Sequence, residues 1–318
     1  MNVSIIMPVL NGEPFISEAL DSTLRQTQPP AEILVVDNGS TDRTAEIVQS
    51  YPAPVRLLHE PFPSAARARL TGVAEASGEA LMFLDADDLI SPTVLEELGA
   101  VLKDQPGAIA CCPWVRYEQV DGEWQTKPAS CTPRKGGQSA LAAWLSGWYH
   151  PPCAVLWSAE AYRRSGGWDP ASFTNDDGDL VMRALVEKVP LIRTAGGLAY
   201  YRRLPEGQVS LSAQRFSARA LTNRLKVIER IEQRLVERGD IFAYRVALRR
   251  AFAAIAHDAK DCEELNSRAE AGAERNKPAY THMLRDFLMR AGNKIGLLED
   301  RPERRRLHAV PGKGVQPR

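Results

Sequence analysis

The sequence predicts an α/β fold with a mostly parallel sheet flanked by helices and followed by a helical module. Apolar, β-branched segments at residues 3–10, 32–36 and 80–84 are typical of strands buried in a parallel sheet. Stretches with helical periodicity alternate with these segments, and such alternation builds a sheet that is covered on both faces. From residue 213 on, long amphipathic patterns replace the alternation.

The first strand stops at Asn11-Gly12, and a helix is expected from Pro14. The second strand, 32–36, runs into Asp-Asn-Gly-Ser-Thr-Asp at 37–42. These small and acidic residues turn the backbone and cap a helix that runs to about Ser50. A carboxylate, Asp37, therefore closes the second strand.

The same alternation continues to about residue 103, with a strand at 55–59, a helix at 65–76, the strand at 80–84 and a helix at 91–103. Past Ala108 the pattern becomes irregular. We expect a hairpin around Asp121-Gly122, a helix at 139–146 and a strand at 153–157. Ligands of a parallel sheet collect at the carboxyl ends of its strands.

The C-terminal third is predicted to be helical. One stripe of apolar residues ends at Gly239, a C-cap, and comprises Phe216, Leu221, Leu225, Ile228, Ile231 and Leu235. A second stripe, in a helix that starts at Ile241, comprises Phe242, Leu248, Phe252 and Ile255. A third helix is expected from Tyr280 to Ala291. Such stripes are typical of core, although they can also dock a partner chain, so a homo-oligomer formed through these helices stays open.

These patterns predict a domain at 1–212, a helical module at 213–300 and a tail at 301–318. The tail is rich in Arg, Pro and Gly and is expected to be disordered, with binding to an anionic lipid or polymer as the alternative. The chain has 318 residues and 44% hydrophobic residues, enough to bury a substantial core.

Charge and hydropathy narrow the class of partner. The formal net charge is zero, so no global field attracts nucleic acid, and no nucleic-acid partner is expected. No apolar stretch approaches the roughly 20 residues that span a bilayer, and the first strand follows Met1 without room for a signal peptide. We therefore expect a cytoplasmic protein without a transmembrane segment, for which peripheral membrane contact stays open. Its five cysteines lack metal-site spacing and are expected to be reduced.

Three carboxylates follow the strand at 80–84, in Asp85-Ala86-Asp87-Asp88. Hard cations such as Mg²⁺ or Mn²⁺ bind through one or two carboxylates together with phosphate oxygens of a substrate. The cluster therefore points towards a nucleoside diphosphate. The alternative is a solvated turn in which Asp88 or Ser91 caps the next helix.

Several motifs together resemble the family 2 glycosyltransferases: SIIMPVLNGE (4–13), EILVVDNGSTDRT (32–44), FLDADD (83–88), GGWD (166–169), NDDGDL (175–180) and YYRRLP (200–205). The resemblance covers roughly residues 1–212. It implies a Rossmann-like GT-A fold and inverting, metal-dependent transfer of a sugar from a nucleotide-diphosphate sugar to an acceptor hydroxyl. Two positions depart from the family pattern: Asp176 stands where Glu is usual, and Leu204 where a His often lies.

The resemblance also implies a donor site. Asp87 is the expected direct ligand of Mn²⁺ or Mg²⁺, and Asp85 the expected contact to ribose or, through water, to the metal. Asp88 is expected to be a cap or a supporting group. The remaining residues expected to bind the nucleotide are Pro8, Val9, Leu10, Glu13, Asp37, Arg67 and Ala86.

Within that set, the backbone of 8–10 brackets the base, with Glu13 assisting. Asp37 accepts the N3–H of a uracil or thymine ring, which favours a UDP-sugar, and capping alone is the alternative for it. The guanidinium of Arg67 suits a phosphate, whereas Arg69 points elsewhere by helical spacing.

Inversion requires a general base for the acceptor hydroxyl, and Asp177 is the candidate. Its place near a helix start favours the ionised form. Asp176 and Asp179 are the fallbacks, and capping of the helix by all three is the alternative. Gly166 and Gly167 can let the backbone approach the donor sugar.

For three further side chains, the sequence leaves both a functional and a structural role open. Trp148 and Trp168 can stack on a sugar or lie in the core. His150 invites a metal-ligand role, because Leu204 removes the usual one, but a His beside Pro-Pro more often bonds to backbone. His59 is expected to be structural.

Acceptors can be a saccharide, a lipid-linked oligosaccharide or another hydroxyl compound, as in synthesis of cell-surface polysaccharide or glycoconjugate, with residues past Ala108 carrying the acceptor side. A non-catalytic nucleotide-sugar-binding protein is the rival interpretation. A nucleotidyltransferase is less favoured, because residues 8–12 offer one glycine where a phosphate loop needs several.

Overall fold

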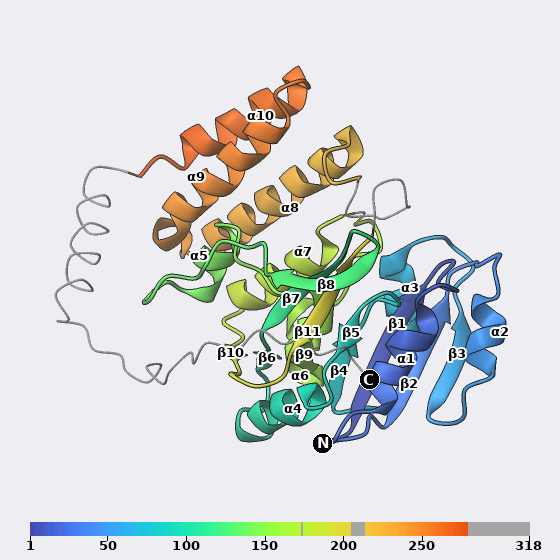
Figure 1. Cartoon of the computed structure of the whole chain (residues 1–318). Coiled ribbons are helices and arrows are strands. Elements are labelled where there is room, and N and C mark those ends of the chain that lie inside the picture. The colour runs from blue at the N-terminus through green and yellow to red at the C-terminus, as the bar shows by residue number, and fades with distance from the viewer. Residues whose placement is uncertain (173, 205–213, 279–318) are drawn as a thin grey trace. The chain divides into compact units, whose positions relative to one another are not determined.

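The computed structural model describes residues 1–172, 174–204 and 214–278. Its centre is a seven-stranded sheet in the order β10-β6-β9-β4-β1-β2-β3 (Figure 1). Only β9 runs antiparallel to its neighbours in that sheet. The strands are β1 (Val3–Val9), β2 (Glu32–Asp37), β3 (Val55–His59), β4 (Ala80–Phe83), β6 (Ile109–Cys111), β9 (Val155–Ser158) and β10 (Leu191–Arg193).

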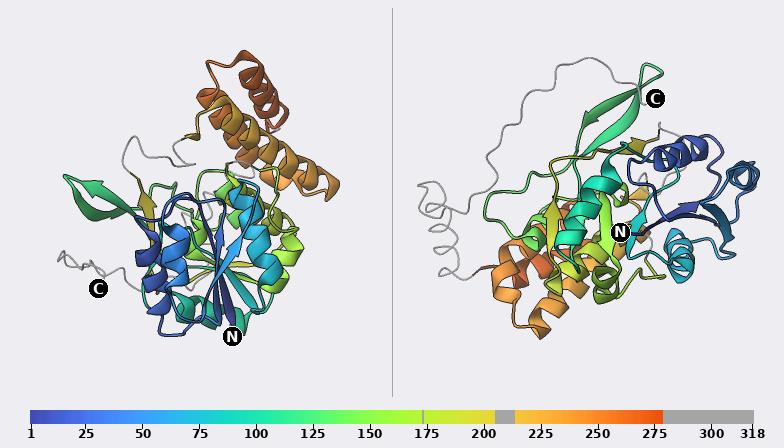
Figure 2. Two further views of the ribbon diagram at one scale, coloured as in Figure 1. Left: turned by 90° about the vertical axis from the view of Figure 1, so that its right-hand side faces the viewer. Right: turned by 90° about the horizontal axis from the view of Figure 1, so that it is seen from below.

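Helices cover both faces of this sheet, as the α/β prediction requires (Figure 2). Alternate residues of one strand enter different cores, because side chains of a strand point to opposite faces in turn. Ile6 belongs to one buried cluster and Ile5 to the other. The helices around the sheet are α1 (Ile16–Leu24), α2 (Thr44–Gln49), α3 (Ala65–Glu75), α4 (Val94–Asp104), α5 (Ala140–Trp144), α6 (Ala159–Ser165) and α7 (Asp176–Val186), with a 3₁₀ turn at Pro152–Ala154.

A second, four-stranded sheet has the order β5-β11-β7-β8. Its strands are β5 (Leu89–Ile90), β7 (Trp114–Val120), β8 (Glu123–Pro128) and β11 (Ala199–Arg203). The predicted hairpin turn is confirmed, since Asp121 and Gly122 connect β7 to β8 with positive φ angles of 53° and 83°. The strand β5 was not predicted, because a strand of two residues shows no periodicity. The helix that follows begins at Val94 and not at residue 91, where it was expected.

Three further helices follow: α8 (Ala218–Glu237), α9 (Ile241–Asp258) and α10 (Glu263–Arg275). Gly239 lies after α8 with φ 72°, as expected of a C-cap glycine. Most of the predicted apolar stripes are buried, but Phe216 is 55% exposed and Phe242 60% exposed, so these two were wrongly assigned to the core. The helix α10 was not predicted, because its buried face uses Ala and Gly beside one Leu.

These helices belong to the same compact unit as the sheet, which comprises residues 1–134 and 138–277. Leu225 and Phe252 lie in the same buried cluster as Ile6 of β1. The boundary at 212 therefore stays a prediction about the sequence. The predicted helix at 280–291 and the tail at 301–318 lie outside the described residues.

Within the described ranges, no helix is both long enough and apolar enough to cross a membrane. The five cysteines are free thiols. Cys111, Cys112 and Cys153 are buried, consistent with packing residues.

Candidate active site

The carboxyl ends of β1, β2 and β4 meet at one edge of the sheet, because the three strands are parallel neighbours. Val9 pairs in register with Asp37, and Ile6 pairs with Phe83, two residues before Asp85. The backbone N–H of Asn38 donates to the carbonyl of Val9 over 2.8 Å, which fixes the two loops against each other. The predicted rim therefore exists, and it carries Asp37, the loop after Val9 and the acidic turn at 85–88.

Asp37, the last residue of β2, is buried at this rim. Its Oδ1 accepts the backbone N–H of Ser40 over 3.0 Å, so part of its role is to shape the turn. Its Oδ2 lies 3.6 Å from Nδ1 of His59, whose side chain is exposed. His59, expected to be structural, is the last residue of β3 and pairs in register with Asp37.

Glu13 is engaged in local structure. Its carboxylate accepts the Nε–H of Arg43 over 2.8 Å and the backbone N–H of Arg43 over 3.0 Å. These bonds lower the pKa of Glu13. The Glu13 side chain thus ties the loop after β1 to the start of α2, and its assistance to the nucleotide stays a prediction.

Two arginines of α3 differ sharply in environment. Arg67 is exposed and its guanidinium lies over the ring of Phe62, 5.0 Å from the centroid. Arg69 is buried, and its guanidinium lies 4.5 Å from the ring centroid of Trp168. Helical spacing had directed Arg69 away from the rim, and that was wrong. Gly72 explains the orientation, since a Cβ there would come within 2.4 Å of Ile6 Cγ2 and push α3 off β1.

Arg69 joins two acids that are far apart in sequence. Its Nη2 lies 2.6 Å from Oδ1 of Asp85, and its Nη1 lies 2.8 Å from Oδ2 of Asp176. Although burial opposes its charge, the two carboxylates raise the pKa of Arg69. The bridge brings the turn after β4 to the start of α7, and so gathers the predicted donor and base residues.

Within the acidic turn, Asp87 and Asp88 differ. Asp87 is partly exposed and makes no ion pair within the described residues. Burial, and then the charge of Asp85, raise the pKa of Asp87 to about 6. Asp88 is fully buried, its Oδ1 accepts the backbone N–H of Arg202 over 2.8 Å, and burial raises its pKa well above the usual range. Asp88 thus fastens β11 to the turn and caps no helix.

Arg202, on β11, hydrogen-bonds to the backbone of the acidic turn. Its Nε donates to the carbonyl of Asp87 over 2.5 Å, and its Nη2 donates to Glu18 Oε2 over 2.5 Å. Three aromatic rings surround the guanidinium, with centroids 4.5–5.1 Å away: Phe15, Tyr117 and Trp124. Sequence reasoning missed this role, although YYRR marked the strand, because the rings come from the N-cap of α1 and from the β7–β8 hairpin.

Asp177 lies in the first turn of α7, is partly exposed and makes no ion pair within the described part of the chain. Burial, and then the charge of Asp176, raise the pKa of Asp177 to about 7. The helix dipole was expected to keep this group ionised, and that expectation was wrong in direction, because burial outweighs it. A base with a pKa near the working pH is well matched to accept a proton.

Asp179 has a structural role. Its side chain is 0% exposed, and its Oδ2 lies 2.8 Å from Arg183 Nε and 3.2 Å from Arg230 Nη1. A carboxylate shared by two guanidinium groups and shielded from solvent cannot reach an acceptor. As a fallback for the base, Asp179 is therefore wrong.

The aromatic candidates and His150 lie in the core. Trp148 and Trp168 are buried, and Trp168 packs edge-on against Phe83. His150 is 3% exposed and its Nδ1 lies 3.0 Å from the carbonyl of Cys112. Burial lowers the pKa of His150 to about 4, so it is neutral at pH 7. The backbone bond expected for a His beside Pro-Pro is thus present.

Among the described residues, the side chains that could bind a cation lie in the acidic turn at 85–88. Among the described residues, no group of three or more His, Cys, Asp or Glu converges as a ready metal cluster. Asp87 nevertheless suits a hard cation, because its oxygens carry no ion pair and lie beside a second carboxylate, Asp85. A cation here would need ligand oxygens to complete its shell.

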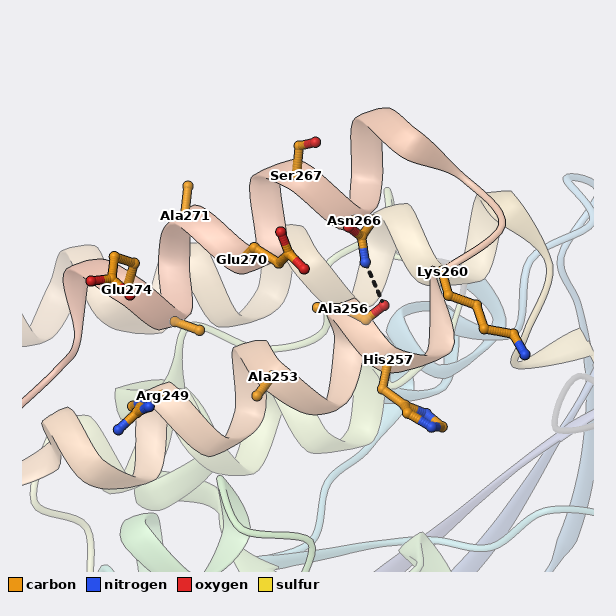
Figure 3. Close-up of a pocket in the computed structure, with 11 residues that line it drawn as sticks. Arg249, Ala253, Ala256, His257, Lys260, Asn266, Ser267, Glu270, Ala271 and Glu274 are labelled. Atoms are coloured by element: carbon orange, nitrogen blue, oxygen red, sulfur yellow. Dashed lines mark hydrogen bonds between the residues drawn. The ribbon is translucent and has the colours of Figure 1, made fainter.

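A shallow groove lies elsewhere, between α9 and α10 (Figure 3). Ala253, Ala256 and Ala271 are among its lining residues, and Asn266 donates to the carbonyl of Ala256 over 2.9 Å. None of the residues at the rim of the sheet lines it.

Comparison with known proteins finds similarity over the part of the chain that includes Asp37 and the acidic turn at 85–88. The family model described as "Glycosyl transferase family 2" matches residues 4–159, from β1 to the start of α6. The glycosyltransferase EpsJ of Bacillus subtilis is 41% identical over 99 residues, which cover 30% of this chain and 29% of that protein. The glycosyltransferase YibD of Escherichia coli is 32% identical over 173 residues, covering 51% and 48%. The chain thus spans less than half the length of these relatives.

Solved structures of TarS from S. aureus share the fold. TarS residues 1–349 in complex with UDP-GlcNAc superpose with a TM-score of 0.56 and 17% identity, covering 88% of this chain and 93% of that chain. The complex of the same TarS fragment with UDP gives a TM-score of 0.53 at 19% identity, covering 98% and 95%. These neighbours bear out the GT-A prediction for the sheet and its helices.

Proposed function

We propose that the chain, which matches the glycosyl transferase family 2 model over residues 4–159, transfers a sugar from a nucleotide-diphosphate sugar to an acceptor hydroxyl with inversion. The observation that carries the proposal is the pair of available acids, Asp87 and Asp177, on either side of the Arg69 bridge. One acid can serve the leaving diphosphate and the other the attacking hydroxyl.

The donor is proposed to bind at the rim formed by β1 and β2. Asp37 can accept the N3–H of a uracil ring, and the backbone of 8–10 can bracket that ring, which favours UDP as the nucleotide. The UDP-GlcNAc complex of TarS supports a donor of this class. Arg67, exposed at the start of α3, forms no ion pair within the described residues, and its guanidinium suits a phosphate.

Departure of the diphosphate leaves negative charge that must be neutralised. Mn²⁺ or Mg²⁺, when bound, supplies that neutralisation as a Lewis acid. In this chain Asp87 and Asp85 would hold the cation, and Ala86 between them would lie against the donor. With a pKa of about 6, Asp87 is largely ionised at pH 7 and protonated at pH 5, so we expect cation binding to weaken in acid.

Asp177 is proposed as the general base. An acceptor hydroxyl must lose its proton as its oxygen attacks the anomeric carbon from the face opposite the leaving group. With a pKa of about 7, Asp177 is about half ionised at neutral pH, and its carboxylate is a stronger base than an ordinary aspartate. Asp176 cannot share this role easily, because Arg69 already binds it.

The acceptor is proposed to be a saccharide, a lipid-linked oligosaccharide or another hydroxyl compound, in synthesis of cell-surface polysaccharide or glycoconjugate. The β7–β8 hairpin, which projects beyond the body of the sheet (Figure 2), is the surface proposed to face it. The names of EpsJ and YibD give no acceptor.

A donor screen followed by product analysis tests the proposal. UDP-, GDP- and dTDP-sugars are added with and without Mn²⁺, and the midpoint of thermal unfolding is recorded, because a ligand stabilises the folded state by mass action. We expect a UDP-sugar to give the largest shift and to require Mn²⁺ for it. Proton NMR of the product of an α-linked donor should then show a β-linkage. An α-linkage contradicts inversion, and binding without any turnover favours the non-catalytic alternative.

A further inference from the structure

The helix α8 reaches the segment that carries the proposed base. Arg230, in the second half of α8, directs its guanidinium at two acids of that segment. Its Nη2 lies 2.8 Å from Oδ2 of Asp169, and its Nη1 lies 3.2 Å from Oδ2 of Asp179. Asp169 precedes α7, and Asp179 lies in its first turn, two residues after Asp177.

A second contact from α8 holds the middle of the same segment, between Asp169 and Asp179. Asn223 of α8 donates from Nδ2 to the backbone carbonyl of Thr174, directly before the N-cap Asn175. Asn223 and Arg230 are seven residues apart, so they lie on one face of α8. One face of this helix therefore holds the entry to α7 at both sides of Asp177.

The chain of contacts continues into the double-glycine turn. Arg183, paired with Asp179, also donates from Nη2 to the carbonyl of Gly167 over 2.6 Å, and from Nη1 to the carbonyl of Ser165. Gly166 and Gly167 have positive φ angles of 85° and 71°, a conformation that glycine adopts without strain. Asp179 thus contacts Arg230 on one side and Arg183 on the other, and Arg183 bonds to the backbone directly before Trp168 and Asp169.

Electrostatics favour a firm contact. Asp179 is fully buried, and among the described residues its Oδ1 has no hydrogen-bond partner, while its Oδ2 lies against the guanidinium groups of Arg183 and Arg230. Although partial burial opposes ionisation, the bonds from Ala171 N–H and Arg230 lower the pKa of Asp169. Asp169 is therefore a charged partner of Arg230 at neutral pH, and Oδ2 of Asp179 lies within 3.2 Å of the same guanidinium.

We propose that Arg230 of α8 is a positioning residue, which sets the place of the general base by clamping Asp169 and Asp179 on either side of it. The helical segment after residue 213 then contributes to catalysis without touching substrate. This inference rests on the proposed function in one respect, since Asp177 is the group being placed. The clamp itself can be measured without turnover.

The test uses the full chain with Arg230→Met, which keeps the apolar stem and removes both ion pairs. Hydrogen exchange should become faster, by about threefold or more, in amides of residues 166–182, because the contacts that hold this segment are lost. In the same variant kcat should fall roughly tenfold or more, since small misplacement of a catalytic group is costly, while the Kd for the UDP-sugar stays within about twofold.

Two further variants separate positioning from loss of stability. Arg268→Met removes an ion pair of 2.9 Å with Glu229, also between α8 and a neighbouring helix but on the surface, and should leave both readouts unchanged. Asp169→Asn removes one arm of the clamp while Arg230 still holds Asp179, and it serves if Arg230→Met does not fold. A double-mutant cycle between Arg230 and Asp169 should show coupling in kcat.

The outcomes distinguish the clamp from the function. Unchanged exchange at 166–182 in both Arg230→Met and Asp169→Asn overturns the clamp, whatever the activity. Faster exchange with unchanged kcat overturns the positioning role alone. A wild-type protein that turns over no donor, yet shows the exchange effect, leaves the clamp standing and contradicts the proposed function.

Discussion

Arg69 and Asp85 form an ion pair of 2.6 Å at the rim of the sheet, and this pair joins α3 to the turn after β4. The same guanidinium holds Asp176, so two of the acids at the site are neutralised by one cation. Asp87 and Asp177 have no such partner within the described residues, and burial raises the pKa of each. The arrangement separates acids that hold the site together from acids available for chemistry.

The first prediction concerns this bridge. Arg69→Met should lower the free energy of unfolding by about 3 kcal/mol at pH 7, because it leaves two carboxylates in a partly buried site without their cation. Arg67 lies two residues earlier on α3 and is exposed. Arg67→Met should therefore change the free energy of unfolding by about 0.5 kcal/mol or less. Urea unfolding of both variants provides the measurement, and equal effects would show that the bridge does not stabilise the fold.

The second prediction concerns pH and activity. The value of kcat/KM should rise as pH passes through about 7, since Asp177 must lose its proton to act as a base. Asp176→Asn removes a like charge beside Asp177 and should move this rise to lower pH. Initial rates between pH 5 and pH 9 test both statements. A rise at the same pH in the variant would exclude the neighbouring charge as a cause.

The third prediction concerns pH and stability. The folded-state pKa of Asp177, about 7, lies above its ordinary value of 3.8, so the folded state binds the proton more tightly than the unfolded chain. Stability from this group is therefore fully present below pH 3.8 and is lost as pH rises through about 7. Asp177→Asn should consequently be more stable than wild type at pH 8, by about 1–2 kcal/mol, with a smaller difference at pH 5.

Chemical denaturation at the two pH values measures that difference. Asp104→Asn, an exposed acid at the end of α4, is the matched control and should show no gain at either pH. A variant of Asp177 that is less stable than wild type at pH 8 would mean that its carboxylate is ionised and stabilising in the folded protein.

The fourth prediction concerns Arg202. Arg202→Lys keeps the charge but cannot bond at once to the Asp87 carbonyl and Glu18, and it loses the flat surface that stacks on three rings. We expect unfolding free energy to fall by about 2 kcal/mol and Mn²⁺ to bind more weakly in the presence of UDP. Calorimetric titration with Mn²⁺ measures the second effect. Arg203→Lys, the neighbouring residue on β11, is the control.

The rim was predictable because its signals are local. Each of β1, β2 and β4 is a short apolar run that ends in turn residues, and parallel neighbours bring such ends together. The motifs around Asp37, Asp85 and Asp177 then marked the acids. None of this required knowledge of which residues far apart in sequence are in contact.

The contacts behind the rim were not predictable in the same way. Arg69 faces the acids because small residues, such as Gly72, let α3 lie close on β1, and a helix rich in small residues gives no clear apolar face. Arg202 is surrounded by rings from the N-cap of α1 and from the β7–β8 hairpin. Arg230 reaches α7 from a helix whose apolar stripe predicted core packing or docking of a partner chain, and neither marks a charged residue. Each depends on tertiary placement.

Asp177→Asn provides the most direct test of the central claim. Release of UDP from the preferred donor, in the presence of Mn²⁺ and acceptor, should fall by roughly a hundredfold or more, because a base that contributes to proton transfer is removed. The Kd for the donor should stay within about twofold, since Asp177 is proposed to act on the acceptor hydroxyl and not to bind the nucleotide. UDP release at the wild-type rate, with donor binding intact, would contradict the assignment of Asp177 as the base.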